Sequence, residues 1–195
     1  MHAAVAGVLL AAGEGSRFGR PKALVELNGQ TLAERGVDLL QAGGAAPILV
    51  VSGAAPIQVD GTQTIHNEEW RTGMGSSLRV ALEALTSADV AAAVIALADQ
   101  PLVGPQAVAR LIAAYRAGAG VAVASYDRQP RNPVLLAREH WPEVIALATG
   151  DAGARPFLRA HADLVTLVEC GDTGRPDDID TQADLARIAG QHRRP

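Results

Sequence analysis

Residues 9–22 read LLAAGEGSRFGRPK, in which the end of an apolar run is followed directly by a glycine-rich, positively charged loop. The apolar run from Val5 to Ala12 lacks polar alternation, which is typical of a short strand covered on both faces. The loop after it contains three glycines, two arginines and a lysine. Glycines let backbone N–H groups approach an anion closely, and the cations neutralise that anion. We therefore predict a polyphosphate site directly after the first strand.

Lys22 is the only lysine among the 17 lysine and arginine residues of the chain. An ammonium is a compact point charge that can bridge the oxygens of a phosphate chain, whereas a guanidinium is a planar fork. We expect Lys22 to neutralise phosphate charge, with Arg17 as a further triphosphate ligand. Arg20 is either another such ligand or a solvated surface residue.

The spacing of this loop does not match two common phosphate-binding motifs. The P-loop needs a glycine–lysine pair, which the sequence lacks, and the dinucleotide fingerprint needs a glycine where Phe18 stands. The spacing that fits is G-x-G-x-R-F-G-x-x-K, which resembles the signature loop of nucleotidyltransferases. With the preceding L-A-A it is most similar to the molybdenum cofactor nucleotidyltransferases. The nucleotide-binding residues that this resemblance implies here are Leu10, Ala11, Ala12, Gly13, Gly15 and Lys22.

Composition excludes several other classes of protein. The chain has 195 residues, 48% of them hydrophobic, and a net charge of −4, which argues against nucleic-acid binding. No apolar run is long enough to span a bilayer, and the first residues predict a strand rather than a signal peptide. The single cysteine, Cys170, cannot form an internal disulfide, and the histidines lack zinc-ligand spacing. We expect a cytoplasmic protein that binds neither nucleic acid nor membranes.

Apolar runs alternate with helical patterns from end to end. This alternation predicts a single domain, residues 1–195, with a three-layer α/β, Rossmann-like fold and a mostly parallel sheet, which the resemblance identifies as a nucleotidyltransferase fold. Ligands of such sheets bind beyond the carboxyl ends of the strands. The expected strands are Val5–Ala11, Ile48–Ser52, Thr64–His66, Ala91–Ala98, Val121–Ser125, Val134–Leu136 and Leu164–Val168. The expected helices are Thr31–Gln41, Ser76–Leu85, Pro105–Ala117, Glu139–Leu147, Ala154–Ala162 and Thr181–Ala189.

Three aspartates are candidate ligands of a divalent cation. Asp99 follows a buried strand, where a carboxylate can hold such a cation, although aspartate is also a common turn residue. In the family that L-A-D-Q-P resembles, the matching aspartate coordinates Mg²⁺, and Mn²⁺ is the alternative ion. The segment D-I-D-T near the end also resembles a family motif, which implies that Asp178 or Asp180 supplies a second carboxylate. Asp180 or Thr181 could instead simply cap the last helix.

The segment between the third strand and the second helix is a further candidate. It resembles the family's N-x-x-W-x-x-G-M-x-S-S-L run, which implies contacts with the nucleotide or the second substrate. The helix start offers unpaired N–H groups and a positive dipole. An ordinary capped helix is the alternative. The residues concerned are Asn67, Gly73, Ser76 and Ser77.

Two later segments resemble the family's acceptor site. Asn132 and Pro133 stand where the family has histidine and proline, and a strand start is the alternative interpretation. Asp151 and Arg155 belong to a G-D-A-G-A-R segment, in which Arg155 is a candidate phosphate ligand. Asp151 could instead cap the following helix.

Taken together, the resemblance implies transfer of CMP from CTP to the phosphate of the molybdopterin–Mo cofactor, with release of pyrophosphate. Lys22, Asp99 and Arg17 would be catalytic, with Mg²⁺ or Mn²⁺ bound. Cytidylyl members resemble L-A-A-G, whereas guanylyl members have glycine at the place of Ala12. A molybdoenzyme or cofactor-delivery protein is a further expected partner.

Three alternatives remain. The nearest is a guanylyltransferase of the same pathway, and the next is a transferase acting on a sugar phosphate or another small phosphate. A nucleotide-binding module without catalytic activity is the third, and the presence of Lys22 and Asp99 argues against it.

Overall fold

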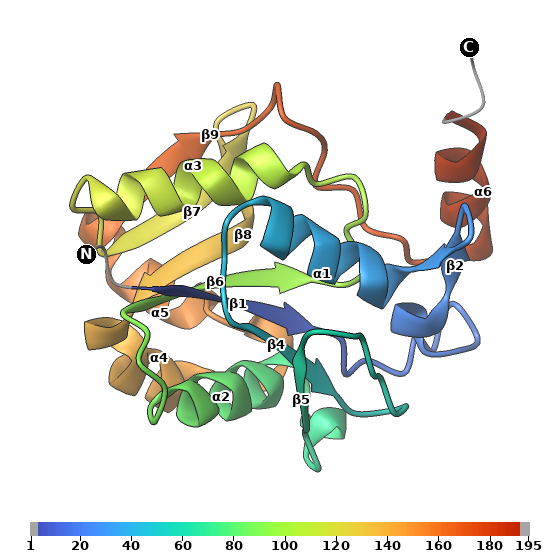
Figure 1. Cartoon of the computed structure of the whole chain (residues 1–195), viewed down its shortest axis with the longest axis horizontal. Coiled ribbons are helices and arrows are strands. Elements are labelled where there is room, and N and C mark those ends of the chain that lie inside the picture. The colour runs from blue at the N-terminus through green and yellow to red at the C-terminus, as the bar shows by residue number, and fades with distance from the viewer. Residues whose placement is uncertain (1–3, 192–195) are drawn as a thin grey trace.

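The computed structural model describes residues 4–191, and a seven-stranded sheet runs through its centre (Figure 1). The strand order is β5-β4-β1-β6-β8-β7-β9, and only β8 runs antiparallel to its neighbours. This sheet confirms the expected α/β class with a mostly parallel sheet. The strands are β1 (Val5–Leu10), β4 (Ile48–Ser52), β5 (Gln63–His66), β6 (Ala92–Leu97), β7 (Val121–Tyr126), β8 (Gln129–Ala137) and β9 (Val165–Glu169).

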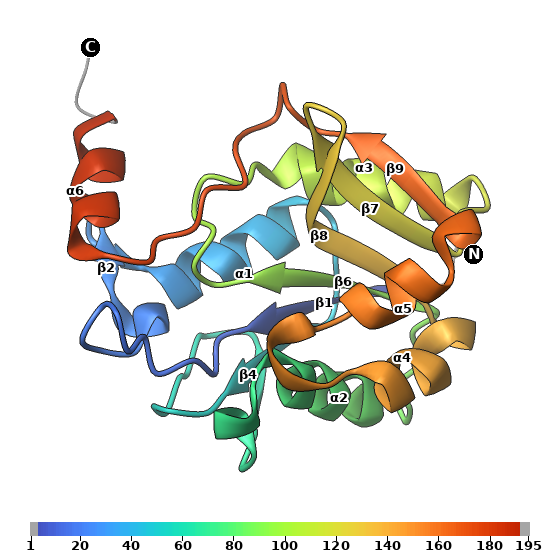
Figure 2. The same ribbon diagram turned by 180° about the vertical axis from the view of Figure 1, so that it is seen from behind.

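Helices cover both faces of the sheet. Figure 1 shows α1 (Leu32–Ala42) and α3 (Pro105–Arg116) on one face. The opposite face carries α2 (Met74–Leu85), α4 (Trp141–Leu147) and α5 (Arg155–Ala160), which are seen from behind in Figure 2. In the described part of the chain, no helix combines the length and the apolar character needed to cross a bilayer.

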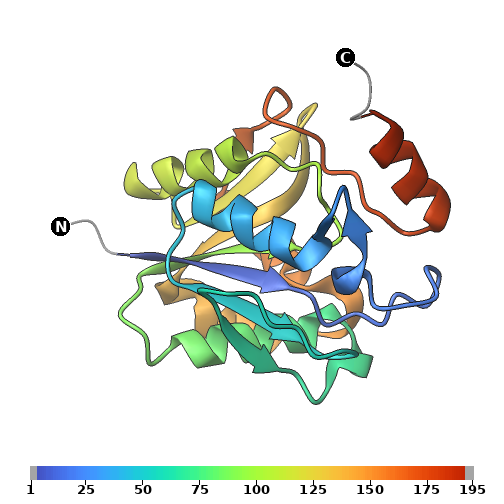
Figure 3. The ribbon, with the colours of Figure 1, turned by 45° about the vertical axis from the view of Figure 1, so that its right-hand side comes forward.

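The last helix lies apart from these two layers. α6 (Gln182–Gln191) stands beyond the sheet, next to a small hairpin of β2 (Glu26–Leu27) and β3 (Gln30–Thr31) (Figure 3). Short 3₁₀ turns complete the chain between the larger elements. They are η1 (Lys22–Leu24), η2 (Trp70–Thr72), η3 (Arg138–His140), η4 (Gly150–Ala152) and η5 (Ala162–Leu164).

Buried apolar side chains form three clusters. The first lies under α1 and α3, and the second lies under α2, α4 and α5. The third joins the loop after β1 to α6, because it contains Phe18, Leu27, Leu32, Ile179 and Ile188, all nearly or fully buried. Removal of these side chains from water is the main force that holds α6 and the segment before it against the loop after β1.

Several boundaries differ from those expected. β8 begins at Gln129 rather than Val134, so Asn132 and Pro133 lie inside a strand that pairs with both β6 and β7. The helix expected from Glu139 begins only at Trp141, after the turn η3. The β2–β3 hairpin was not expected, although Asn28 and Gly29 at its tip have the positive φ angles of a tight hairpin turn.

A capping box begins α1. The Thr31 hydroxyl accepts a hydrogen bond from the Glu34 backbone N–H at 3.2 Å, and the Glu34 carboxylate accepts one from the Thr31 N–H at 2.7 Å. Such reciprocal bonds satisfy two helix-start donors that would otherwise lack partners.

Gly75, in the first turn of α2, allows the close contact between this helix and the segment before η4. A Cβ atom there would lie 2.7 Å from the Thr149 nitrogen and 2.8 Å from the Ala148 carbonyl carbon. Because these are backbone atoms, we expect Gly75→Ala to lower the free energy of unfolding by about 2 kcal/mol. Chemical denaturation measures this change.

Gly190→Ala is the matched control, since Gly190 lies in α6 and a Cβ atom there meets no neighbour within 4 Å. This variant should be neutral or gain up to about 1 kcal/mol from helix propensity. Equal stability of the two variants would show that the α2 contact is not tight.

Candidate functional site

The glycine-rich loop leaves β1 at the carboxyl edge of the sheet and folds into a tight turn. The carbonyl of Gly15 accepts hydrogen bonds from the N–H groups of Phe18 and Gly19, both at 2.8 Å. Gly15 has a φ of +64°, and a Cβ atom on it would overlap the carbonyl oxygen of Arg20. Only glycine fits this position without displacing the loop. The Phe18 ring is buried in the third cluster, which anchors the turn.

Four charged side chains meet at the base of this loop. The Lys22 Nζ donates hydrogen bonds to Asp99 Oδ2 at 2.7 Å and to Asp180 Oδ1 at 2.8 Å. The Arg17 guanidinium lies 3.3 Å from the same oxygen of Asp180. The Lys22 side chain is only 19% exposed, so its ion pairs are shielded from most of the solvent. The structure therefore brings Arg17, Lys22, Asp99 and Asp180 together.

Local structure explains why these residues meet. β1 and β6 are adjacent parallel strands, so the glycine-rich loop and Asp99 leave the same edge of the sheet side by side. The backbone N–H of Ile179 donates to the carbonyl of Asp99 at 2.8 Å, while the Ile179 side chain is fully buried. These two contacts hold Asp180, the next residue, against Lys22.

The two alternatives for capping α6 are resolved. The Thr181 hydroxyl accepts a hydrogen bond from the Asp184 N–H at 3.2 Å, and the Asp184 carboxylate accepts one from the Thr181 N–H at 2.9 Å. Thr181 is thus the capping side chain. The carboxylate of Asp180 remains directed to Lys22 and Arg17.

The charges at the site alter two pKa values. Burial would lower the pKa of Lys22, but the adjacent carboxylates of Asp99 and Asp180 outweigh burial and raise it above 10.5. The ammonium is therefore fully charged at neutral pH. Burial raises the pKa of Asp178, against a hydrogen bond from Gln100, and the negative charges of Asp99 and Asp180 raise it further.

An open cleft of about 630 Å³ lies above this charged group. One wall is the glycine-rich loop, and the other is formed by η2 and the start of η4. These two segments of the second wall touch closely, because Gly73 has a φ of +110° and a Cβ atom on it would overlap the backbone of Gly150. The residues that line the cleft are Gly13, Glu14, Gly15, Ser16, Arg17, Phe18, Lys22, Trp70, Arg71, Gly73, Asp151 and Asp180.

Other candidate nucleotide ligands lie behind the lining. Leu10, Ala11 and Ala12 are buried at the end of β1. The amide nitrogen of Asn67 donates to the hydroxyls of Ser76 and Ser77 at 2.8 and 3.0 Å, and all three side chains are buried. α2 begins at Met74, so these serines lie within its first turns and brace η2.

The candidate acceptor residues are divided between two places. Asp151 lines the cleft and does not cap α5, whose N-cap residue is Ala154. The Arg155 guanidinium donates to the carbonyls of Asp151 at 3.0 Å and Ala152 at 3.3 Å, so it braces its own loop. Asn132 and Pro133 lie within β8 and not in the lining of the cleft.

Several lining residues were not singled out from the sequence. Glu14, Ser16 and Phe18 belong to the glycine-rich loop itself, so the motif that located the loop could also have located them. Trp70 is the tryptophan of the N-x-x-W-x-x-G-M-x-S-S-L run and Arg71 follows it, so that motif could have located both.

Comparison with known proteins agrees with this geometry. Residues 7–165 match the MobA-like NTP transferase domain family. The nicotine blue oxidoreductase of Paenarthrobacter nicotinovorans is 36% identical over 203 residues, covering 94% of this chain and 96% of that protein. The probable molybdenum cofactor guanylyltransferase of Opitutus terrae (strain DSM 11246 / JCM 15787 / PB90-1) is 33% identical over 125 residues, covering 64% and 62%.

A solved structure has the same architecture over nearly its whole length. It is Rv0371C of Mycobacterium tuberculosis H37Rv in complex with manganese, which superposes with a TM-score of 0.77 and 26% identity. The match covers 96% of this chain and 98% of that one. The family match, the sheet order and the glycine-rich loop lead to one conclusion. The chain belongs to the MobA-like NTP transferase family and is a nucleotidyltransferase of that type.

Proposed function

We propose that this protein transfers CMP from CTP to the terminal phosphate of molybdopterin–Mo cofactor and releases pyrophosphate. The observation that carries the proposal is the position of the Lys22 ammonium, between Asp99 and Asp180 and at the base of the glycine-rich loop. Family membership and the relative named as a molybdenum cofactor guanylyltransferase support this choice of chemistry and acceptor.

The reaction requires no covalent bond to the enzyme. An oxygen of the acceptor phosphate attacks the α-phosphorus of CTP, and a new P–O bond forms. The bond between the α-phosphorus and the bridging oxygen of the β-phosphate breaks, and pyrophosphate leaves with that electron pair. Such a displacement is accelerated by positioning and by neutralisation of charge. Lys22 and Arg17 would neutralise the phosphate oxygens, and the backbone of Gly13 and Gly15 would lie along the nucleotide.

The residues present fit a divalent cation. Asp99 and Asp180 already converge on one positive group, and carboxylate oxygens are the ligands that Mg²⁺ and Mn²⁺ prefer. Within residues 4–191 no three His, Cys, Asp or Glu side chains are arranged to hold a metal ion, so these two carboxylates would share it with phosphate oxygens and water. When bound, the ion would offset charge on the α-phosphate and the leaving pyrophosphate. The manganese complex of the mycobacterial protein supports a divalent ion of this kind.

Asp180 is better placed than Asp178 to be the second carboxylate. Asp180 shares the Lys22 ammonium with Asp99, whereas Oδ1 of Asp178 accepts a hydrogen bond from Gln100 at 2.8 Å. Asp178 would then act through its negative charge beside the metal ligands.

The choice of CTP rests on Ala12. Its methyl group is buried at the end of β1, beside the loop that would hold the base. A methyl group there would narrow the base pocket against a purine. Because one relative is named as a guanylyltransferase, GTP is the alternative nucleotide.

A second candidate function follows from the relative named nicotine blue oxidoreductase, which matches this chain along nearly its whole length. An oxidoreductase of this kind would need an electron donor bound in the cleft. It would consume that donor without releasing pyrophosphate, so the two functions differ in their products.

Pyrophosphate release from four nucleotides with a series of acceptors tests the proposal. We expect CTP with molybdopterin–Mo cofactor to give the highest kcat/KM, at least about tenfold above GTP, because a methyl-sized difference in a pocket yields discrimination of this order. A sugar phosphate serves as the alternative acceptor, and oxidation of NADPH in the presence of a quinone dye tests the redox function. Preference for GTP would overturn the choice of base, and NADPH oxidation without pyrophosphate release would overturn the transferase.

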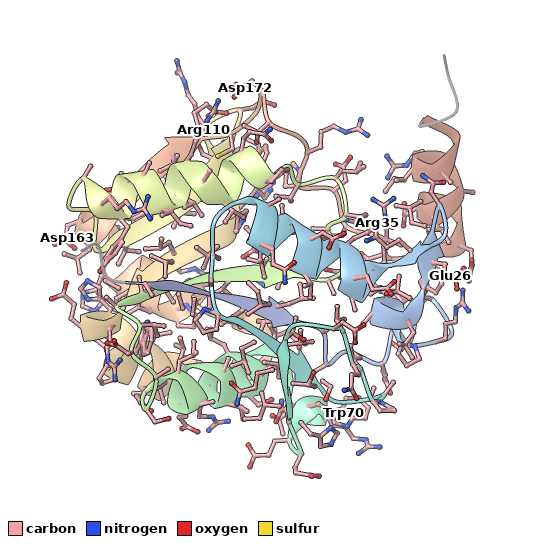
Figure 4. All side chains as sticks on the ribbon, in the orientation of Figure 1. Glu26, Arg35, Trp70, Arg110, Asp163 and Asp172 are labelled. Carbon is pink, nitrogen blue, oxygen red and sulfur yellow. The ribbon has the colours of Figure 1, made fainter. Side chains whose placement is uncertain are left out.

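Removal of the Lys22 ammonium should abolish most turnover. We expect Lys22→Ala to lower kcat/KM by at least about 100-fold, because a preorganised charge near the reacting phosphate is lost. Arg110→Ala is the control, since Arg110 pairs with Asp172 far from Trp70 and the cleft (Figure 4). Circular dichroism checks that both variants fold. Wild-type activity in a folded Lys22→Ala variant would remove Lys22 from the mechanism.

Asp178 should lower the free energy of unfolding at neutral pH, because folding raises the pKa of its carboxyl group. The folded state therefore binds the carboxyl proton more tightly than the unfolded state. The stabilisation that comes from this proton is complete below pH 3.8 and is lost as pH rises through the raised pKa. Asp178→Asn keeps an oxygen that can accept from Gln100. We expect it to raise the free energy of unfolding at pH 7 by up to about 1 kcal/mol, with no gain below pH 3.8.

Asp172→Asn is the control of opposite sign. Its hydrogen bond from Arg110 lowers the pKa of Asp172, so its stabilisation is present above pH 3.8 and lost as pH falls through the lowered value. This variant should lose stability at pH 7. Thermal unfolding in metal-free buffer measures both variants, and a destabilised Asp178→Asn at pH 7 would contradict the expected effect of burial.

A further inference from the structure

Trp70 is the aromatic side chain, only partly buried, that lines the cleft together with Arg71. Four of the six phenylalanine, tyrosine and tryptophan side chains are buried, and Tyr115 packs against the first apolar cluster. Trp70 packs against the second apolar cluster and also lines the cleft opposite the glycine-rich loop, and Figure 4 shows it on η2. The exposed part of this ring is available to stack against a planar group in the cleft.

The position of Trp70 is fixed by the scaffold behind it. Its Cβ atom packs so closely on Gly53, after β4, that a Cβ atom on Gly53 would lie 2.6 Å away. Its backbone N–H donates to the carbonyl of Asn67 at 3.3 Å, and the buried side chain of Asn67 is in turn bonded to Ser76 and Ser77. The ring therefore presents a fixed surface to the cleft.

Arg71 lies over this ring. The central carbon of its guanidinium is 4.3 Å from the ring centroid, within the range of a cation–π contact. Arg17 and Lys22, the other cations of the cleft, both pair with Asp180. Among residues 4–191, no carboxylate forms an ion pair with Arg71. The Trp70 ring thus orients the Arg71 guanidinium, and no carboxylate neutralises the charge of that guanidinium in the described part of the chain.

We propose that Trp70 and Arg71 form the acceptor platform, which binds a planar heteroaromatic phosphate. The ring of the acceptor stacks on the Trp70–Arg71 pair, and its phosphate accepts hydrogen bonds from the Arg71 guanidinium. This inference rests on the proposed function and names the class of its second substrate. The nucleobase of the NTP is the other planar group that could stack there, so the experiment separates the two.

Three probes distinguish binding of the planar ring from binding of the phosphate. Flavin mononucleotide carries both a planar heterocycle and a terminal phosphate, riboflavin carries only the ring system, and ribose 5-phosphate carries only the phosphate. Binding is measured on the full chain with saturating α,β-methylene CTP and Mg²⁺, by flavin fluorescence for the first two probes and by calorimetry for the third. A parallel titration gives the affinity for α,β-methylene CTP alone.

Trp70→Leu should raise the Kd of flavin mononucleotide and of riboflavin by about tenfold, as expected for loss of aromatic stacking, and leave ribose 5-phosphate unchanged. Trp70→Phe keeps a ring and should stay within about threefold of wild type. Arg71→Gln should weaken flavin mononucleotide and ribose 5-phosphate by about fivefold or more, with a smaller effect on riboflavin. Arg71→Lys should bind between wild type and Arg71→Gln, because the ammonium keeps the charge but not the planar fork.

Unchanged flavin affinity in Trp70→Leu and Arg71→Gln would overturn the proposal. Weaker binding of α,β-methylene CTP alone would also overturn it, because the Trp70 ring would then stack on the nucleobase. Arg71 is exposed, so Arg71→Gln keeps the test valid if Trp70→Leu fails to fold. The proposed function is tested separately. It would be wrong if no pair of nucleotide and acceptor released pyrophosphate, even where the flavin affinities changed as expected.

Discussion

The candidate site depends on one ammonium group held between two carboxylates. Lys22 pairs with Asp99, which is 77 residues away in the sequence, and with Asp180, which is 158 residues away. Each of these charges would be unfavourable alone in a partly buried place, because the desolvation of an unpaired charge is large. Together they join the first loop, the end of the central strand β6 and the start of the last helix. The same charges make the base of the cleft suitable for phosphate and for a divalent cation.

Two kinds of apolar contact make this arrangement possible. β1 and β6 are neighbouring buried strands, so their loops begin side by side. The third cluster then folds the carboxyl-terminal segment back onto the first loop, because Ile179 and Ile188 pack against Phe18 and Leu27. The charged residues lie on a framework that hydrophobic burial has already fixed, so the ion pairs need only select the final geometry.

The sequence was sufficient for the parts that local pattern determines. Unbroken apolar runs located β1, β4 and β6, and the glycine spacing located the loop, because strand burial and tight turns leave direct marks in the residue types. The pattern could not choose between Asp178 and Asp180. Both stand next to Ile179, and only tertiary packing shows which carboxylate reaches Lys22.

Other features escaped the sequence for similar reasons. β8 is longer than its apolar run because Gln129 and Pro130, before Val134, pair with Tyr126 and Ser125 of β7. The β2–β3 hairpin is too short to show alternation, although its Asn-Gly turn is a recognised signal. The motif that contains Trp70 left open whether its segment faces the nucleotide or the second substrate, and the place of Trp70 and Arg71 in the cleft becomes visible only when η2 is seen across from the glycine-rich loop.

The two walls of the cleft are built independently. One wall joins β1, β6 and the segment before α6 through charge. The other joins η2, α2 and η4 through glycine contacts at Gly73 and Gly75, which let two backbones touch. Substitutions on the second wall can therefore alter what the cleft accepts without disturbing the ion pairs of Lys22.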